Sequence, residues 1–296
     1  MADFVEFFGF SDEPFKLTPD ADYFYPSSSH EEALGLLSFF LKEGDGFAVL
    51  IGSPGTGKTT LIRRLLKSIP DNYTFAFIVT PMLSPDQLLK AILEDIGLKS
   101  TDNFAANLKE LQTYLLNLAK DKRKLLLVID EAQSLPLESL EQIRLLSNIE
   151  TNDFKPLQIL LSGQPELEGI IKNRLSQLNQ RITIRCYLKP LNREETEEYI
   201  QYRFAKAGGS IPLDKKAKNL IFKISKGIPR LINSVMKRAL LMAYAEKRKS
   251  ITKDDILTAA ESLELFSSKK RMFYLFVGIF FAIILIAFIL FYLWRG

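Results

Sequence analysis

A glycine-rich stretch at residues 50–61 has the residue types and the spacing that phosphate binding requires. It fits the pattern G-x-x-x-x-G-K-[ST] at Gly52, Gly57, Lys58 and Thr59. A triphosphate needs many converging backbone N–H groups, and glycine permits the backbone angles that bring such groups together. We predict that Lys58 contacts the terminal phosphates of a nucleotide and that Thr59 ligates Mg²⁺.

The whole loop and the two residues after its lysine are the predicted nucleotide-binding set. The set is Gly52, Ser53, Pro54, Gly55, Thr56, Gly57, Lys58, Thr59 and Thr60. Residues 47–52 form a continuous apolar run, typical of a strand buried on both faces, and residues 58–67 repeat apolar side chains at helical spacing. Strand, loop and helix therefore follow in the order that a phosphate site needs, which a coincidental glycine-rich turn does not explain.

Two adjacent carboxylates, Asp130 and Glu131, end a second apolar run at residues 124–129. Open parallel sheets carry their ligand sites at the carboxyl ends of the strands. We therefore expect Asp130 to hold Mg²⁺ together with Thr59, and Glu131 to be aimed at an attacking water. A strand that ends in a solvated acidic turn is the alternative, but the phosphate loop earlier in the chain favours hydrolysis of a nucleotide.

A third polar position follows the apolar run at residues 157–163. Ser162 or Gln164 could contact the γ-phosphate or orient the water, and the spacing does not choose between them. A role in a turn or a helix cap has equal weight.

Three arginines are candidates for cations at the phosphates. Arg181 lies just before the last strand, at residues 182–188, and Arg174 lies earlier in the same stretch. Either is suitably placed to reach the nucleotide of a neighbouring subunit. Arg230 follows Pro229 at the start of a helical pattern and could reach back to the phosphates. A surface arginine is the alternative for each.

Strand-like and helical patterns alternate along the first two thirds of the chain. The strand-like runs are residues 47–52, 73–79, 124–129, 157–163 and 182–188. One intervening helix is predicted to begin after Ser84 and to stop at Gly97. This alternation predicts an α/β fold with a parallel sheet and right-handed crossovers. Residues 192–266 carry helical signals only.

A segment at residues 272–294 contains no charged residue and is long enough to cross a bilayer, which takes about 20 apolar residues. Lys269, Lys270 and Arg271 precede it, whereas only Arg295 follows. The positive-inside rule therefore predicts one transmembrane helix with the large N-terminal part in the cytoplasm.

The charge balance and the single cysteine narrow the function classes. Setting aside the four basic residues that flank the apolar segment leaves 35 of the 39 basic residues, against 35 acidic residues. A nucleic-acid-binding domain usually has a basic surplus, so no nucleic acid partner is expected.

Cys186 has no partner for an internal disulfide, which indicates a reducing compartment. Its apolar-alternating surroundings favour a strand residue over a nucleophile.

Six stretches together resemble the ATPase domain of the general secretion pathway protein A family of AAA+ proteins, which includes relatives from pilus and exopolysaccharide loci. The stretches are FFGFSDEPFKLTPDADYFYPSSSHEEAL, GSPGTGKTTL, LLLVIDEAQSL, LQILLSGQPEL, LNQRITIRCYLKPL and SKGIPRLINSVMKRALLMAY. The resemblance covers nearly all of residues 4–262. It implies an AAA+ core with a helical lid, Mg²⁺-dependent ATP hydrolysis in a homo-oligomer, and a role in assembling cell-envelope machinery.

The same resemblance implies roles for individual residues. Gln164 matches a first sensor of the nucleotide, Arg230 a second sensor, and Arg181 the arginine supplied to a neighbouring subunit. It also places the N-terminal signature near the adenine, where His30, the single histidine, could contact the base. A solvated histidine is the favoured interpretation. Ser28 and Glu31 are predicted to form a capping box that starts a helix.

These inferences define an expected domain organisation. Residues 1–45 form an N-terminal linker and first helix, residues 46–190 the α/β nucleotide-binding core, residues 191–266 the helical lid, residues 267–271 a basic linker and residues 272–294 the membrane helix. In the family, a periplasmic peptidoglycan-binding segment follows the membrane helix, whereas this sequence stops at Gly296. We therefore expect another polypeptide to act on the far side, or a partner in the membrane or cytoplasm.

The favoured function is a membrane-anchored AAA+ ATPase of the bacterial inner membrane that drives assembly or operation of an export system for protein, pilus or polysaccharide. A DNA-associated regulatory ATPase of the transposition type is the alternative.

Overall fold

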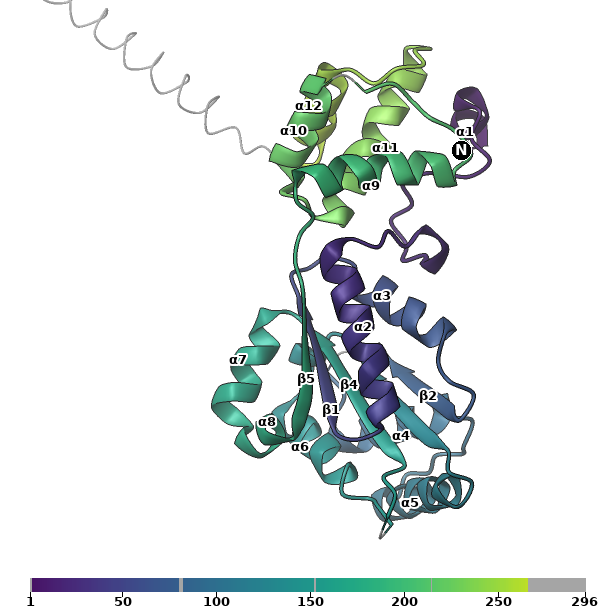
Figure 1. Cartoon of the computed structure of the whole chain (residues 1–296), viewed down its shortest axis with the longest axis vertical. Helices are drawn as coiled ribbons and strands as arrows, with labels where there is room; N and C mark the ends of the chain where they lie inside the picture. The colour runs from purple at the N-terminus through teal and green to yellow at the C-terminus, as the bar shows by residue number, and fades with distance from the viewer. Residues whose placement is uncertain (1, 80–81, 152, 214, 266–296) are drawn as a thin grey trace, which may run out of the picture.

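The computed structural model describes residues 2–79, 82–151, 153–213 and 215–265. Within these residues the chain forms an α/β lobe and a helical lobe, joined by extended segments (Figure 1). The strands are β1 (Phe47–Gly52), β2 (Tyr73–Ile78), β3 (Lys124–Ile129), β4 (Leu157–Gly163) and β5 (Ile182–Leu188). Each predicted strand is therefore confirmed.

The five strands form one parallel sheet in the order β2-β3-β4-β1-β5. All residues of β1 are buried, as the continuous apolar run predicted. Because side chains alternate along a strand, Phe47, Val49 and Ile51 face one hydrophobic cluster, and Ala48 and Leu50 face another. The sheet therefore needs helices on both faces.

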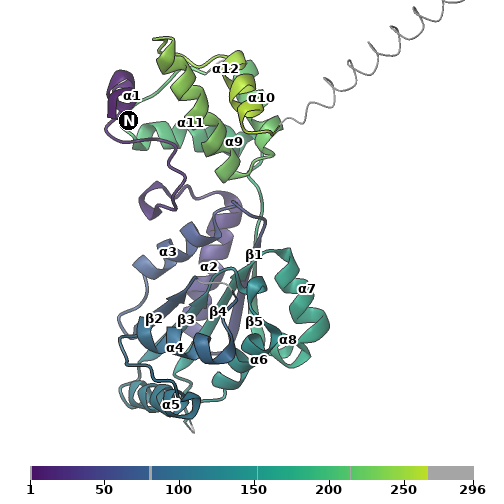
Figure 2. The same ribbon diagram turned by 180° about the vertical axis from the view of Figure 1, so that it is seen from behind.

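Helices cover both faces of the sheet. Those of the α/β lobe are α2 (Ser28–Glu43), α3 (Lys58–Lys67), α4 (Pro85–Asp95), α5 (Phe104–Lys120), α6 (Leu137–Leu146), α7 (Pro165–Arg174) and α8 (Ser176–Arg181), with short 3-10 turns η1 (Ala21–Tyr23) and η2 (Ala132–Ser134). Helices α2 and α3 lie in front of the sheet in Figure 1, and α4 and α6 lie in front of it in Figure 2.

The helical lobe contains residues from both ends of the described chain. Its helices are α1 (Ala2–Phe8), α9 (Arg193–Lys206), α10 (Lys215–Ser225), α11 (Pro229–Ala245) and α12 (Lys253–Ser262). Phe10 and Phe15 are buried in its core, where Phe15 packs edge-on against Phe204 at 5.1 Å between ring centroids. The first residues of the chain thus pack on the helical lobe, although the sequence predicted only a linker there.

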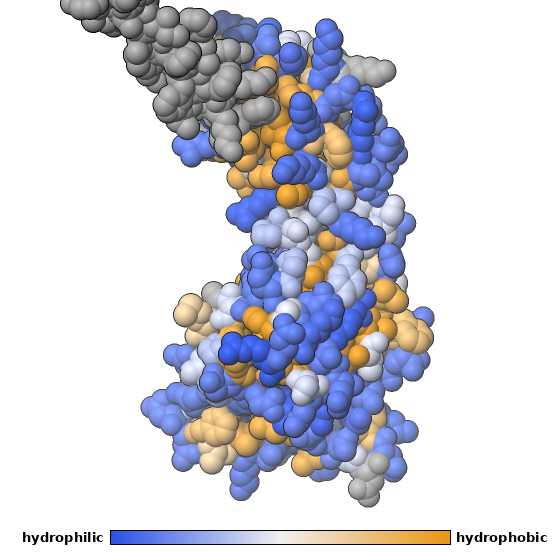
Figure 3. Space-filling model, turned by 90° about the vertical axis from the view of Figure 1, so that its left-hand side faces the viewer, coloured by the Kyte–Doolittle hydropathy of each residue, from blue (hydrophilic) through white to orange (hydrophobic). Residues whose placement is uncertain are grey.

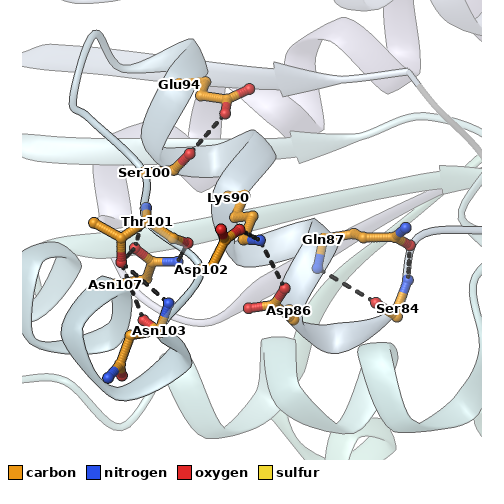
Figure 4. Close-up of polar contacts among 10 residues, drawn as sticks. All are labelled: Ser84, Asp86, Gln87, Lys90, Glu94, Ser100, Thr101, Asp102, Asn103 and Asn107. Carbon is orange, nitrogen blue, oxygen red and sulfur yellow. Dashed lines mark hydrogen bonds and ion pairs between the residues drawn. The ribbon is translucent and has the colours of Figure 1, made fainter.

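Helix α4 begins and ends as the sequence predicted. Ser84 and Gln87 form a capping box, and Gly97 follows the helix with φ +80°. Lys90 lies between Asp86 and Asp102, 3.1 Å and 3.0 Å from their carboxylates (Figure 4). These polar contacts fix the loop between α4 and α5.

The start of α2 differs from the prediction. Ser27, not Ser28, is the N-cap, and Ser28 already lies in the helix. Both the backbone N–H and the hydroxyl of Ser28 donate to Glu195 of α9, at 3.0 and 2.8 Å. The predicted pairing of Ser28 with Glu31 is therefore wrong, because Glu195 of the helical lobe takes the place of the local partner.

The single cysteine lies inside the α/β lobe. Cys186 is buried in β5, and its Sγ lies 3.8 Å from the carbonyl oxygen of Ala33 in α2. Burial raises the pKa of the thiol to about 12. This matches the prediction of a strand residue.

The surface face in Figure 3 is mainly hydrophilic, with apolar residues in separate groups. No helix within the described ranges is long and apolar enough to cross a membrane. The predicted basic linker at 267–271 and membrane segment at 272–294 lie outside those ranges.

Candidate active site

The strand order brings the predicted site residues together. In the sheet, β4 lies between β1 and β3. The loop after β1, the carboxylates after β3 and the polar residues at the end of β4 therefore meet at one edge.

The loop between β1 and α3 has the backbone conformation that its glycines permit. Gly55 and Gly57 have φ of +80° and +104°, in the region that favours glycine. The ammonium of Lys58 is buried and donates to the carbonyl oxygen of Gly52 at 2.8 Å. Burial lowers the pKa of Lys58, while the charges of Glu131 and Asp130 oppose this shift. The ammonium thus sits beside a backbone acceptor that a phosphate oxygen can replace.

Asp130 links all three strand ends. Its carboxylate accepts hydrogen bonds from the hydroxyl of Thr59 at 2.5 Å, from the hydroxyl of Ser162 at 2.7 Å and from the backbone N–H of Glu131 at 3.0 Å. Only 2% of Asp130 is exposed, so these donors replace the water that a carboxylate otherwise needs. Thr59 and Asp130, predicted as metal ligands, therefore lie in direct contact.

Glu131 stands beside this cluster with an unusual backbone. Its φ of +53° is in the left-handed region, which is uncommon for a residue with a side chain. The carboxylate accepts hydrogen bonds from Gln133 at 2.6 Å and Gln164 at 3.2 Å. Burial acts to raise the pKa of Glu131, but these hydrogen bonds and the charge of Lys58 outweigh it and lower the pKa. Glu131 is thus a carboxylate at neutral pH.

The two polar candidates at the end of β4 have different contacts. Ser162 is buried and donates to Asp130, whereas the Gln164 side chain donates to Glu131. The backbone N–H of Gln164 also donates to the side-chain oxygen of Gln133 at 3.1 Å. Sequence reasoning did not single out Gln133, although its place two residues after Glu131 was a usable signal.

The three arginines lie in different surroundings. Arg230 is exposed and lines the cavity over the loop, and its backbone N–H donates to the carbonyl of Gly55 at 3.2 Å. Arg181 is half-buried at the end of α8 and donates to the hydroxyl of Ser147 at 2.6 Å. Arg174 is exposed and lines a separate open hollow. Neither Arg181 nor Arg174 lines the cavity over the loop of its own chain.

A cavity of about 350 Å³ lies over the loop, between the two lobes. Residues 16–20 and 23–25 of the N-terminal segment form one wall, and α9 and α11 of the helical lobe contribute another. Arg203 of α9 belongs to this lining, is 5% exposed, and places its guanidinium 4.5 Å from the ring of Tyr23. Its signal in the sequence was a charged residue at helical spacing from the buried Tyr199.

His30 lies beneath the loop and is 4% exposed, so the favoured prediction of a solvated histidine is wrong. Its Nε2 lies 3.0 Å from the carbonyl oxygen of Thr56, and its Nδ1 lies 2.6 Å from the hydroxyl of Ser27. Burial lowers the pKa of His30, opposed by the hydrogen bond with Thr56 and the charge of Glu195. Because both ring nitrogens have protein partners, a hydrogen bond to a base is not supported either.

Known proteins share this fold and part of this sequence. Residues 41–171 match the family described as AAA domain. The chain is similar in structure to Cdc6p of Pyrobaculum aerophilum, with a TM-score of 0.67, 18% identity and coverage of 90% of this chain and 73% of that one. It is also similar to the RuvB branch migration motor of Thermotoga maritima, with a TM-score of 0.56, 22% identity and coverage of 80% and 70%.

These matches and the site define the class: an α/β AAA+ fold with a five-stranded parallel sheet, a helical lid and a nucleotide-binding AAA domain. Within this class, the sequence is similar to general secretion pathway protein A of Aeromonas hydrophila, with 42% identity over 264 residues. The predicted resemblance is confirmed. The match covers 87% of this chain and 48% of that protein, so the chain spans about half the length of this relative.

Proposed function

We propose that the chain hydrolyses ATP with Mg²⁺ at the edge of the sheet where β1, β3 and β4 end. One observation carries the proposal. Thr59, Asp130 and Glu131 form one connected group, with the Thr59 hydroxyl 2.5 Å from the Asp130 carboxylate and Glu131 beside it. Two ligands for a hard cation and an ionised carboxylate for a water are what phosphoryl transfer needs.

The residues present fit Mg²⁺, and the loop fits a phosphate. Thr59 and Asp130 offer oxygen atoms, the donors that Mg²⁺ prefers, and substrate phosphates usually complete its shell. The loop needs glycine at position 57, where φ is +104° and a Cβ would lie only 2.9 Å from His30. When bound, the cation would neutralise charge on the phosphates.

We assign roles to the remaining side chains from their contacts. Glu131 orients the attacking water, and Gln133 and Gln164 hold its carboxylate in place. Lys58 binds the terminal phosphates in place of the Gly52 carbonyl. Arg230 of α11 lines the same cavity, so its contact with a bound nucleotide would depend on the position of the helical lobe.

The wider role is proposed from the similarity to general secretion pathway protein A. The relative's name assigns it to the general secretion pathway, and 87% of this chain aligns with it. We propose that this chain works as a homo-oligomer in the assembly or operation of a cell-envelope export system. The uncharged segment at 272–294 supports a single-pass anchor in the bacterial inner membrane with the ATPase on the cytoplasmic side.

Replacing Glu131 by glutamine tests the proposed reaction. Glu131→Gln keeps the shape of the side chain but removes the ionised carboxylate, so turnover falls by about 100-fold or more while ATP binding persists. Steady-state hydrolysis by the full chain in detergent, with and without Mg²⁺, measures the first effect, and binding of a fluorescent ATP derivative measures the second. Glu110→Gln, at an exposed position of α5, is the matched control and keeps wild-type turnover. Unchanged hydrolysis in Glu131→Gln contradicts the assignment.

The same variant tests the cellular role. Held with ATP in its native membrane and then solubilised gently, Glu131→Gln should retain its partners for identification by mass spectrometry. Export components among them would support the proposed role. Nucleic acid, together with hydrolysis that DNA stimulates in a steeply salt-dependent way, would favour the DNA-associated regulator.

A further inference from the structure

His30 makes direct contact with the phosphate-binding loop from below. Its Nε2 lies 3.0 Å from the carbonyl oxygen of Thr56. A Cβ built on Gly57 would lie 2.9 Å from the same nitrogen. The imidazole therefore contacts Thr56 and occupies the space that a side chain at position 57 would need.

The tautomer of His30 follows from its partners. A carbonyl oxygen can only accept, so Nε2 carries the proton and donates to Thr56. Nδ1 then accepts from the hydroxyl of Ser27, which lies 2.6 Å away and is 2% exposed. The ring of Phe24 packs edge-on against the imidazole at 5.6 Å. Three neighbours thus fix the ring and its proton.

This contact sets the orientation of one peptide unit in the loop. In a planar trans peptide, the carbonyl and the following N–H point in opposite directions. With the Thr56 carbonyl turned to His30, the N–H of Gly57 must point away from His30. The reverse orientation of this peptide would bring the N–H of Gly57 against the Nε2 proton.

We propose that His30 is a positioning residue for nucleotide binding, which acts through the Thr56 carbonyl to keep the Gly57 N–H available to a phosphate. The inference rests on the proposed function, because it concerns the same loop. It assigns His30, which also lines the cavity, to the loop. Ser27 holds the imidazole in the tautomer that donates to Thr56.

Two substitutions of similar size separate the hydrogen bond from the packing. Gln at position 30 keeps an N–H donor that can reach Thr56, whereas Met fills similar space and has no donor. We expect His30→Met to weaken binding of a fluorescent ADP by about three- to tenfold, and His30→Gln to bind within about twofold of wild type, as the loss of one hydrogen bond implies. The measurement uses the full chain in detergent, with the melting temperature of each variant recorded.

A second pair of variants tests the tautomer. Ser27→Ala releases Nδ1, so ADP affinity falls by part of the His30→Met effect. Ser38→Ala, at an exposed position of the same helix, leaves the affinity unchanged. This pair keeps the proposal open to refutation if the variants at position 30 do not fold.

The outcomes distinguish this inference from the proposed function. ADP affinity that is equal in wild type and His30→Met overturns the positioning role while nucleotide binding stands. Gln and Met variants that are equally weak also overturn it, because packing would then explain the effect. A wild-type chain that binds no nucleotide overturns both.

Discussion

At the scale of single residues, Glu131 combines an unfavourable backbone conformation with a hydrogen-bonded carboxylate. Its positive φ costs conformational energy, which persists only where the surroundings hold it. The backbone N–H of Glu131 bonds to Asp130, and its side chain is fixed by Gln133 and Gln164. The strain therefore points the carboxylate away from the strand and toward the cavity that it lines.

Removing Gln133 should change the pH dependence of hydrolysis. Its hydrogen bond helps to lower the pKa of Glu131, so Gln133→Ala raises that pKa. The carboxylate is then protonated at a higher pH, and the acid limb of the pH–rate profile moves upward. Gln201→Ala, at an exposed position of α9, should leave the profile unchanged. An acid limb that stays in place in Gln133→Ala contradicts the role of Gln133.

Single residues differed in how far the sequence predicted them. Lys58, Thr59, Asp130 and Glu131 form the expected group because a fixed loop pattern and a strand end define them locally. His30 was assigned to solvent because its partner Thr56 is 26 residues further along the chain. A lone histidine in a first helical turn gives no local sign of burial.

At the scale of the elements, helix ends decide where side chains point. Helix α4 begins with a capping box, in which the hydroxyl of Ser84 accepts from the N–H of Gln87 (Figure 4). The serine at this position and the glutamine three residues later were enough to predict it. For α2 the sequence predicted a capping box at Ser28, but Ser27 is the N-cap, and Ser28 bonds to the distant Glu195 instead.

Ser84→Ala should destabilise the α/β lobe. It leaves the N–H of Gln87 without its acceptor, which costs about 1 kcal/mol for a typical cap. Chemical denaturation of the full chain, followed by circular dichroism, measures the free energy of unfolding. Ser84→Asp keeps an acceptor at the same place and serves as the control. Equal losses in both variants would show that the cap is not responsible.

At the scale of the whole molecule, the N-terminal segment joins the two lobes across the nucleotide cavity. The guanidinium of Arg203 in α9 donates to the carbonyl of Pro14 at 2.5 Å, and Lys237 of α11 lies 2.5 Å from Glu13. Further along, His30 contacts the Thr56 carbonyl of the loop, and Ser27 contacts His30. The sequence could not predict this path, because Arg203 lies 189 residues from Pro14 along the chain, and Lys237 lies still further from Glu13.

The loop and the lid meet at Gly55, which gives a test of their contact. A Cβ there would lie 2.7 Å from the Cβ of Arg230 and 3.1 Å from the Cγ2 of Ile228, and the φ of +80° disfavours alanine. Gly55→Ala should therefore displace the start of α11, weaken ADP binding and destabilise the chain by about 1 kcal/mol or more. Gly169→Ala, in α7 with open space around its Cβ, should be neutral or stabilising. Tight ADP binding by Gly55→Ala would contradict the need for this contact.

We predict that an arginine of one subunit completes the nucleotide site of its neighbour in the oligomer. If Arg181 completes a neighbour's site, Arg181→Ala loses turnover, and mixing it with Glu131→Gln restores part of it, since each chain supplies what the other lacks. Ser147→Ala removes one intrachain partner of Arg181 and keeps the cation, so it should retain activity. If Arg174→Ala alone shows the complementation, Arg174 takes the assigned role. If neither does, the shared site is wrong.

The buried thiol of Cys186 makes the chain a convenient object for chemical labelling. The sequence contains one cysteine, which is 1% exposed, and its pKa of about 12 keeps it a thiol at neutral pH. Thiolate is the form that reacts with maleimides. A cysteine introduced on the lid or beside the loop can thus carry a dye without competition from Cys186. The slow rate at which Cys186 itself is labelled would then measure how often β5 separates from α2.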